Sequence, residues 1–159
     1  MLDIATDAEL EPSVRAFRTL LLLAQRLRYL MDDRLRPDGM TTQQAALLTV
    51  VAGLGRPSLT EAAAALGSTH QNVAQLVAVL QRKGLLQLEA DPTDRRRRLL
   101  TATEANDRYW SQRDGADHAA VEGWFAALSA EEVQTMCSLA GRLLASLQDV
   151  DPGSDAALG

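Results

Sequence analysis

The chain has 159 residues, of which 47% are apolar and 23% are charged, and its formal net charge is −5. This composition is typical of one globular domain with a sizeable core. No apolar run is long enough to cross a bilayer, and the first residues lack the basic-then-apolar layout of a signal peptide, so we expect a cytoplasmic protein without membrane association.

Apolar periodicity and capping residues predict three helices in the first part of the chain. Leucine-rich steps of three and four residues predict a long helix over 9–36, and two of its faces are apolar. A single small domain cannot easily cover both faces. Threonine at its start and glycine at its end predict a second helix over 41–55. A third is predicted over 56–67, where Ser58 and Glu61 have the spacing of a capping box.

The pattern then changes from helix to hairpin. Gly67 marks a tight turn, and a helix is predicted over 68–84. Alternating residues then predict a strand over 85–90, and a second strand is predicted over 97–102. The turn between them contains Pro92, Asp94 and the start of a run of four arginines. The sequence therefore predicts a β-hairpin with a basic tip.

Two more helices are predicted after the hairpin, over 103–128 and 129–148, and residues 149–159 are predicted to be a disordered tail. The fold class is therefore mainly α, with a helix, a turn, a second helix and a two-stranded hairpin in the order of a winged helix-turn-helix. Basic side chains outnumber acidic ones between residues 40 and 103, although acidic ones dominate elsewhere. This asymmetry indicates a polyanionic partner for the middle of the chain.

A helix-turn-helix reads DNA with the first turns of its second helix, which lies in the major groove. Amide side chains can pair bidentately with adenine, and the exposed surface of the predicted helix over 68–84 is polar and uncharged. We therefore predict major-groove contacts from Thr69, His70, Gln71, Asn72 and Gln75. Predicted contacts to DNA phosphates are Ser58, Ser68 and Lys83. The alternative is that these side chains are ordinary helix surface.

The arginine-rich tip suits a minor groove, because narrow A·T-rich grooves attract guanidinium groups. We predict contacts there from Arg95, Arg96, Arg97 and Arg98, oriented by Asp94. A carboxylate that pairs with one guanidinium fixes its direction, and the remaining arginines can neutralise phosphates. The alternative is a solvated turn that binds nothing.

The segment GLLQLEADPTDRRRRLLTATEAN resembles the wing of the MarR family of bacterial transcriptional regulators. Ala102 and Asn106 depart from the family pattern, and the order of elements matches over roughly residues 10–148. The resemblance implies that Arg96, two residues after the wing aspartate, enters the minor groove. The residues that match the pattern are Gly84, Leu85, Asp91, Pro92, Asp94, Arg95, Arg96 and Thr103.

The resemblance also implies a homodimer that acts as a repressor on a palindromic operator. Residues 1–36 and 104–148 would form the dimerisation region, and residues 37–103 the DNA-binding lobe. A small aromatic or phenolic effector is implied, without a cofactor. Tyr109 and Trp110 are candidates for the effector pocket, although packing is the more ordinary role of such a tryptophan.

The alternatives to DNA binding are a protein–protein interaction module and an enzyme. The hairpin of a winged helix can instead serve a protein–protein interaction module by binding an acidic partner. An enzyme is disfavoured, since the sequence contains no nucleophile–base set, no GxxxxGK and no HExxH. Cys137 and the two distant histidines make no recognisable metal site, and Cys137 is expected to be a small core residue rather than a redox sensor.

Overall fold

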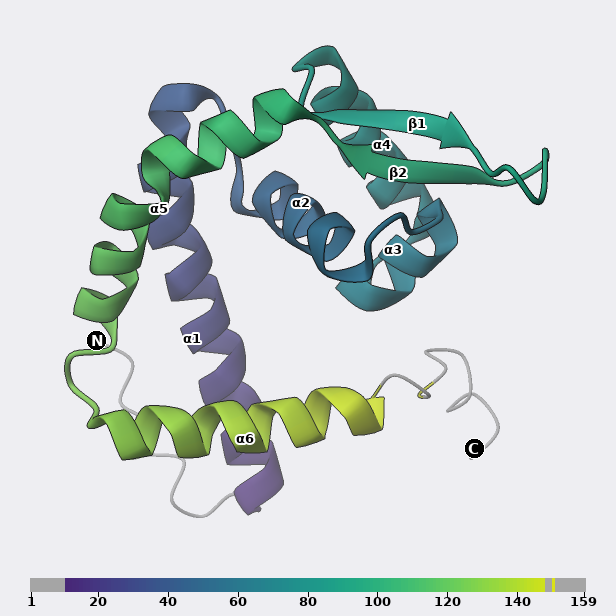
Figure 1. Cartoon of the computed structure of the whole chain (residues 1–159). Helices are drawn as coiled ribbons and strands as arrows, with labels where there is room; N and C mark the ends of the chain where they lie inside the picture. The colour runs from purple at the N-terminus through teal and green to yellow at the C-terminus, as the bar shows by residue number, and fades with distance from the viewer. Residues whose placement is uncertain (1–10, 148–149, 151–159) are drawn as a thin grey trace. The chain divides into compact units, whose positions relative to one another are not determined.

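The computed structural model describes residues 11–147 and residue 150 (Figure 1). The described residues fall into two compact units, divided between Leu47 and Leu48. Residues 9 and 10 of the first predicted helix lie outside the described residues, as does the predicted tail apart from residue 150. None of the described helices combines the length and hydropathy that crossing a membrane requires.

The first unit contains α1, Pro12–Leu35, and the short 3-10 helix η2, Arg36–Asp38. Gly39 follows with a φ of 66°, a left-handed conformation that favours glycine, and it reverses the chain into α2, Thr42–Leu54. The N–H of Thr42 donates to Asp32 Oδ1 at 2.7 Å, so the start of α2 is fastened to the end of α1. The long helix predicted over 9–36 is confirmed over residues 12–35.

The second unit contains the helix-turn-helix, formed by α3, Leu59–Leu66, and α4, His70–Arg82. Ser58 and Glu61 form the predicted capping box at the start of α3. Gly67 ends α3 with a φ of 58°, and its left-handed conformation makes the tight turn. The hydroxyl of Thr69 then caps α4 by accepting the N–H of Asn72 at 3.1 Å.

The wing is an antiparallel pair, β1, Leu86–Ala90, and β2, Arg98–Ala102, in which Leu88 lies opposite Leu100. Both predicted strands are confirmed to within one residue at their starts. The middle of β2 is joined to the residues before α3, because the N–H of Leu100 donates to the carbonyl of Pro57 at 2.8 Å. Figure 1 shows the hairpin extending from this junction to a free tip.

One apolar core holds the helix-turn-helix and the wing together. The end of α2, both helices and both strands contribute fully or nearly buried side chains to the second unit, and α3 packs against α4 and β2. Burial of this kind contributes about 25 cal/mol per Å² of apolar surface. One core therefore positions both α4 and the wing. It consists of Leu48, Val51, Ala62, Ala63, Val73, Val77, Leu80, Leu85, Leu86, Leu99 and Leu100.

The last two helices are α5, Glu104–Trp124, and α6, Ala130–Leu147. Thr103 connects α5 to the wing, since its hydroxyl donates to the Gly84 carbonyl at 2.6 Å and accepts the N–H of Asn106 at 3.3 Å. A capping box of Ser129 and Glu132 begins α6. Within the described chain α6 has no buried residue, and large apolar side chains on α1 and on α6 are exposed.

Candidate nucleic-acid interface

The first turn of α4 presents polar groups to solvent. His70, Gln71 and Gln75 are exposed, and Thr69 caps the helix through its hydroxyl oxygen. The backbone N–H groups of His70 and Gln71 belong to the first turn, so the helix itself provides no acceptor for them. A helix start of this kind offers side chains to base edges and N–H groups to a phosphate.

Asn72 differs from its neighbours, because it is half-buried and its side-chain amide donates to Ser68 Oγ at 2.8 Å. The sequence predicted a freely exposed base-reading amide here. The structure instead uses one of its donors to brace the turn before α4, and Ser68 is the partner. Base contact by Asn72 and phosphate contact by Ser68 stay predictions.

The other two predicted phosphate contacts lie near the ends of helices. Ser58 Oγ accepts the Glu61 N–H at 3.2 Å, so its oxygen is engaged in the capping box. Lys83 follows the last residue of α4 and is exposed. Phosphate contact by Ser58 and by Lys83 stays a prediction.

The tip of the wing is a tight turn from Asp94 to Arg97, closed by the Arg97 N–H, which donates to the Asp94 carbonyl at 3.0 Å. Arg95 and Arg96 occupy its two central positions. Asp94 was expected to orient a guanidinium. Its carboxylate instead accepts the backbone N–H of Arg96 at 2.9 Å, because an aspartate at the first position of a turn reaches the N–H two residues on.

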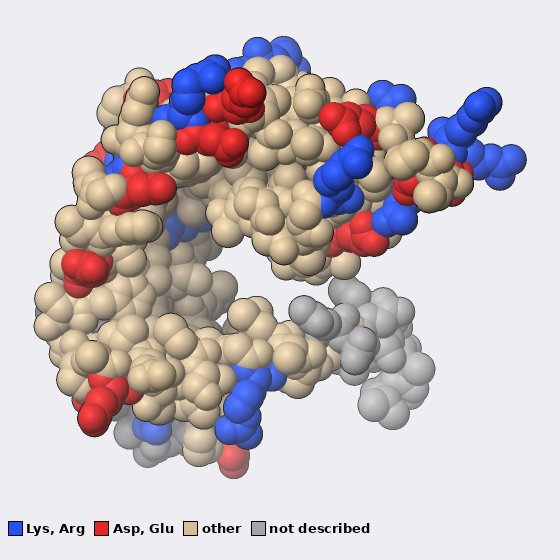
Figure 2. Space-filling model, in the orientation of Figure 1, with Lys and Arg blue, Asp and Glu red and all other residues tan. Residues whose placement is uncertain are grey.

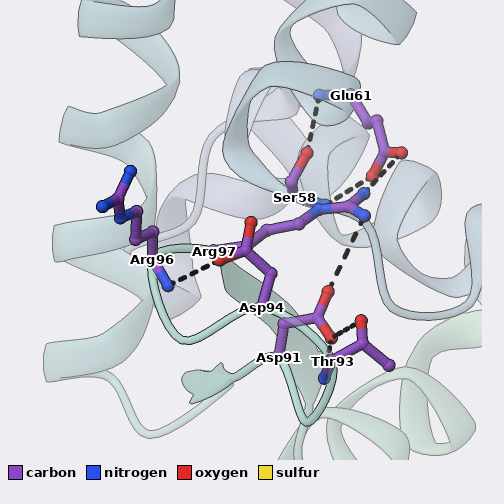
Figure 3. A network of polar contacts seen from close by, with 7 residues as sticks. All are labelled: Ser58, Glu61, Asp91, Thr93, Asp94, Arg96 and Arg97. Carbon is purple, nitrogen blue, oxygen red and sulfur yellow. Dashed lines mark hydrogen bonds and ion pairs between the residues drawn. The ribbon is translucent and has the colours of Figure 1, made fainter.

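Arg97 was predicted to face the minor groove, but its guanidinium is engaged within the protein (Figure 3). Nη2 lies 2.6 Å from Glu61 Oε1, and Nη1 lies 3.7 Å from Asp91 Oδ2. Asp91 is only 7% exposed and also accepts hydrogen bonds from the N–H and the hydroxyl of Thr93. This network joins α3 to the wing tip and was not predicted from the sequence.

Both carboxylates of the network are ionised at neutral pH. Hydrogen bonds from the Ser58 N–H and then from Arg97 hold the pKa of Glu61 below its ordinary value. The Thr93 hydroxyl and N–H lower the pKa of Asp91, to which the charge of Arg97 adds. Each carboxylate therefore presents a negative charge to the guanidinium of Arg97.

The remaining wing arginines, Arg95, Arg96 and Arg98, are exposed and form no ion pair with any described residue. Figure 3 shows the side chain of Arg96 pointing away from Glu61 and Asp91. Figure 2 shows basic side chains gathered at the free end of the hairpin. Their charge is therefore available to a polyanion.

Tyr109 and Trp110, the candidate effector contacts, are half-buried on α5. The indole N–H of Trp110 donates to Oδ1 of the buried Asn106 at 2.9 Å, and the two rings meet edge to face at 4.9 Å between centroids. This gives Trp110 a packing role, and contact with an effector stays a prediction. Arg113 and Asp117, 3.1 Å apart, continue the polar series along α5 and were not predicted from the sequence.

Cys137 does not occupy the core position that the sequence predicted. It is exposed on α6. The physical reason is that α6 buries none of its residues within the described chain, so an apolar stripe there does not identify core positions of a single subunit.

Known sequences resemble this chain over the helix-turn-helix and the wing. A sequence model of the MarR family matches residues 38–97, which span the helix-turn-helix and the wing tip. The chain is 32% identical over 114 residues to the transcriptional activatory protein BadR of Rhodopseudomonas palustris. That match covers 68% of this chain and 63% of BadR, so it spans less than two thirds of that relative.

Solved structures share the same fold. A MarR protein from Peptoclostridium difficile superposes with a TM-score of 0.76 at 17% identity, covering 94% of each chain. A Staphylococcus aureus MepR–DNA complex gives a TM-score of 0.68 at 22% identity over 82% of this chain and 96% of that one. Bordetella bronchiseptica BpsR, whose DNA binding is regulated by 6-hydroxynicotinic acid, gives 0.71 at 20% identity over 81% and 98%.

Proposed function

This chain belongs to the MarR family of transcriptional regulators, and from that premise we propose that it binds a specific double-stranded operator as a homodimer. In this proposal α4 reads base edges in the major groove, and the wing tip places arginine in the adjacent minor groove. Its place of action is then the chromosome, in the cytoplasm.

One observation carries the proposal. The wing tip holds Arg95 and Arg96 at the centre of a tight turn, exposed and without an ion-pair partner among the described residues. The same core that supports this hairpin supports α4, whose first turn exposes His70 and Gln71. Base-reading groups and groove-directed charge therefore occur on one rigid support, as two-groove recognition of DNA requires.

The likeness to the MepR–DNA complex is consistent with this use of the fold. Electrostatic attraction to phosphates supplies much of the affinity of such proteins and makes it dependent on salt. Direct contacts from α4 then supply the discrimination between sequences. The predicted contacts therefore divide into sequence reading by α4 and charge neutralisation by the wing.

Exposed apolar side chains support the homodimer. On α1, Phe17 is 65% exposed, and on α6, Leu144 is 66% exposed. Large apolar side chains exposed along a helix mark an interaction site. A twofold dimer would separate two recognition helices by about one turn of DNA, ~34 Å, and would match a palindromic operator.

We further propose that a small aromatic or phenolic effector regulates DNA binding and that the protein acts as a repressor. Regulation of BpsR by 6-hydroxynicotinic acid supports the effector class. An effector acts by binding better to a dimer whose recognition helices are wrongly spaced, which shifts the population away from the DNA-bound state. BadR is named a transcriptional activatory protein. Transcription in vitro, with and without this protein, therefore tests whether it represses.

Selection of bound duplex from a random pool tests the proposal. We expect an enriched palindrome, whose affinity for the protein falls steeply as salt rises. Scrambled duplex of equal length is the control. If no sequence is enriched and affinity is weak at low salt, the hairpin serves a protein partner rather than DNA.

A further inference from the structure

We propose that Arg97 is a positioning residue, which holds the wing tip at a fixed place relative to α3 and does not itself contact DNA. This inference rests on the proposed operator binding, although its first consequence can be measured without DNA. It divides the arginine run into one structural member and three that remain available to the duplex.

The middle of β2 is fastened by its backbone to the residues just before α3. The N–H of Leu100 donates to the Pro57 carbonyl, and Leu99 forms a β-bridge with Ser58. Arg56 and Glu89 add an exposed ion pair. The turn itself lies beyond these contacts, so a tie nearer the tip is needed to fix where the turn points.

Arg97 provides that tie because it bridges three segments. It is the last residue before β2, and its guanidinium lies 2.6 Å from Glu61 in α3 and 3.7 Å from Asp91 at the end of β1. Its backbone N–H also closes the turn by donating to the Asp94 carbonyl, and its carbonyl accepts the Asp91 N–H at 3.0 Å. Both its side chain and its backbone therefore act on the position of the tip.

The charges around Arg97 also separate it from its neighbours. Two ionised carboxylates face its guanidinium, whereas no described carboxylate pairs with Arg95, Arg96 or Arg98. The Glu61 carboxylate is itself held by the N–H of Ser58 at 2.8 Å. Although 41% of the Arg97 side chain is exposed, its guanidinium is therefore directed to α3 before DNA arrives.

A tip fixed in this way sets the register between the minor-groove arginines and α4. α3 packs against α4, so a contact to Glu61 at the start of α3 is a contact to the recognition unit. Loss of the contacts that Arg97 makes with Glu61 and Asp91 leaves the charge of the tip available for phosphates but allows the tip to move. Operator binding should therefore weaken more than binding to random duplex.

Three variants separate positioning from direct contact. Arg97→Gln removes the guanidinium. Glu61→Gln removes the opposing charge but keeps the capping box, in which Gln can replace Glu. Arg98→Gln removes a neighbouring arginine that has no ion-pair partner in the described chain. All three are compared with wild type on the selected operator and on scrambled duplex over a salt series.

A residue that neutralises one phosphate contributes about 0.9 to the slope of log K against log salt. We expect Arg98→Gln to lower the slope by about this amount, whereas Arg97→Gln and Glu61→Gln leave the slope unchanged. Both of the latter should weaken operator binding by about two- to fivefold, the size of one half-exposed ion pair, with a smaller effect on scrambled duplex. A slope change in Arg97→Gln equal to that in Arg98→Gln overturns the proposal.

Hydrogen exchange of the free protein provides the second readout. Arg97→Gln and Glu61→Gln should each speed exchange at the Asp91 and Arg97 amides, and the double variant should add little to either. Arg97→Lys, which keeps the charge but not the planar fork, should restore part of the protection. Unchanged exchange in both single variants overturns the inference, whereas faster exchange in a protein that selects no operator supports the tie and refutes only the proposed function.

Discussion

Asp94 Oδ1 accepts the backbone N–H of Arg96 at 2.9 Å, so this carboxylate holds the wing turn rather than a guanidinium. Asp94→Ala removes that acceptor and should weaken operator binding by ~1 kcal/mol, about the value of one hydrogen bond. Asp94→Asn keeps an oxygen at the same place and should bind nearly as well as wild type. Fluorescence anisotropy of labelled operator measures both affinities.

The Asp94→Asn variant decides between the two roles of the carboxylate. If Asp94→Asn binds the operator as weakly as Asp94→Ala, the charge of the carboxylate rather than its hydrogen bond in the turn sets the affinity. That result would support the ion pair with a guanidinium that the sequence predicted. Circular dichroism of both variants is the control for folding.

Arg96→Ala tests the minor-groove contact directly. The side chain is exposed at the centre of the turn, so its loss should cost ~1–3 kcal/mol of operator affinity and leave the oligomeric state intact. Arg108→Ala is the matched control, since it removes one positive charge from the exposed surface of α5. Equal losses in the two variants would mean that net charge alone sets the affinity.

Local signals in the sequence predicted most of the fold, because its elements are defined by nearby residues. Ser58 and Glu61 make a capping box within one turn, and Gly67 takes the left-handed conformation that its place in the chain requires. The first strand of the wing followed from alternation before the Asp-Pro turn. Such signals need no knowledge of distant contacts.

The division of roles within the arginine run could not be predicted in the same way. Arg97 meets Glu61 across 36 positions of the chain, and nothing in the run itself distinguishes it from Arg96. Turn geometry and ion pairing both favour aspartate beside arginine, so the sequence alone could not show that the Asp94 carboxylate accepts the backbone N–H of Arg96. The role of each residue depends on contacts between distant parts of the chain, which no local signal in the sequence shows.

Gln71 and Asn72 should respond differently to alanine substitution, although both face the predicted major groove. Gln71 is exposed, so Gln71→Ala should relax sequence preference at one base pair by ~1–3 kcal/mol without changing stability. Asn72→Ala also removes the hydrogen bond to Ser68 and should lower the free energy of unfolding by ~1 kcal/mol. Binding-site selection and urea denaturation, applied to both variants, measure the two effects. Destabilisation by Gln71→Ala would contradict its assignment to the free surface.

Acid should loosen the wing, since the folded-state pKa values of Glu61 and Asp91 are lowered from 4.5 and 3.8. A carboxyl group with a lowered pKa stabilises the folded state above its ordinary value, and that contribution is lost as pH falls through the folded-state value. The free energy of unfolding should therefore fall as the pH drops below the ordinary pKa values of 4.5 for Glu61 and 3.8 for Asp91. Glu61→Gln, which does not titrate, should show a shallower fall in parallel urea titrations. Identical pH profiles would show that Glu61 is not stabilised in its ionised form.

Leu143→Glu tests whether α6 forms the interface between subunits. Leu143 is 47% exposed on a helix that buries no residue within the described chain, so the change should leave the subunit folded. A carboxylate in an apolar interface is costly to desolvate, and we expect sedimentation to show monomers at concentrations where wild type is dimeric. Operator affinity should fall with it, because one subunit supplies one recognition helix. Gln134→Glu adds the same charge at an exposed polar position of α6 and should stay dimeric. A dimeric Leu143→Glu variant with wild-type affinity would place the interface elsewhere.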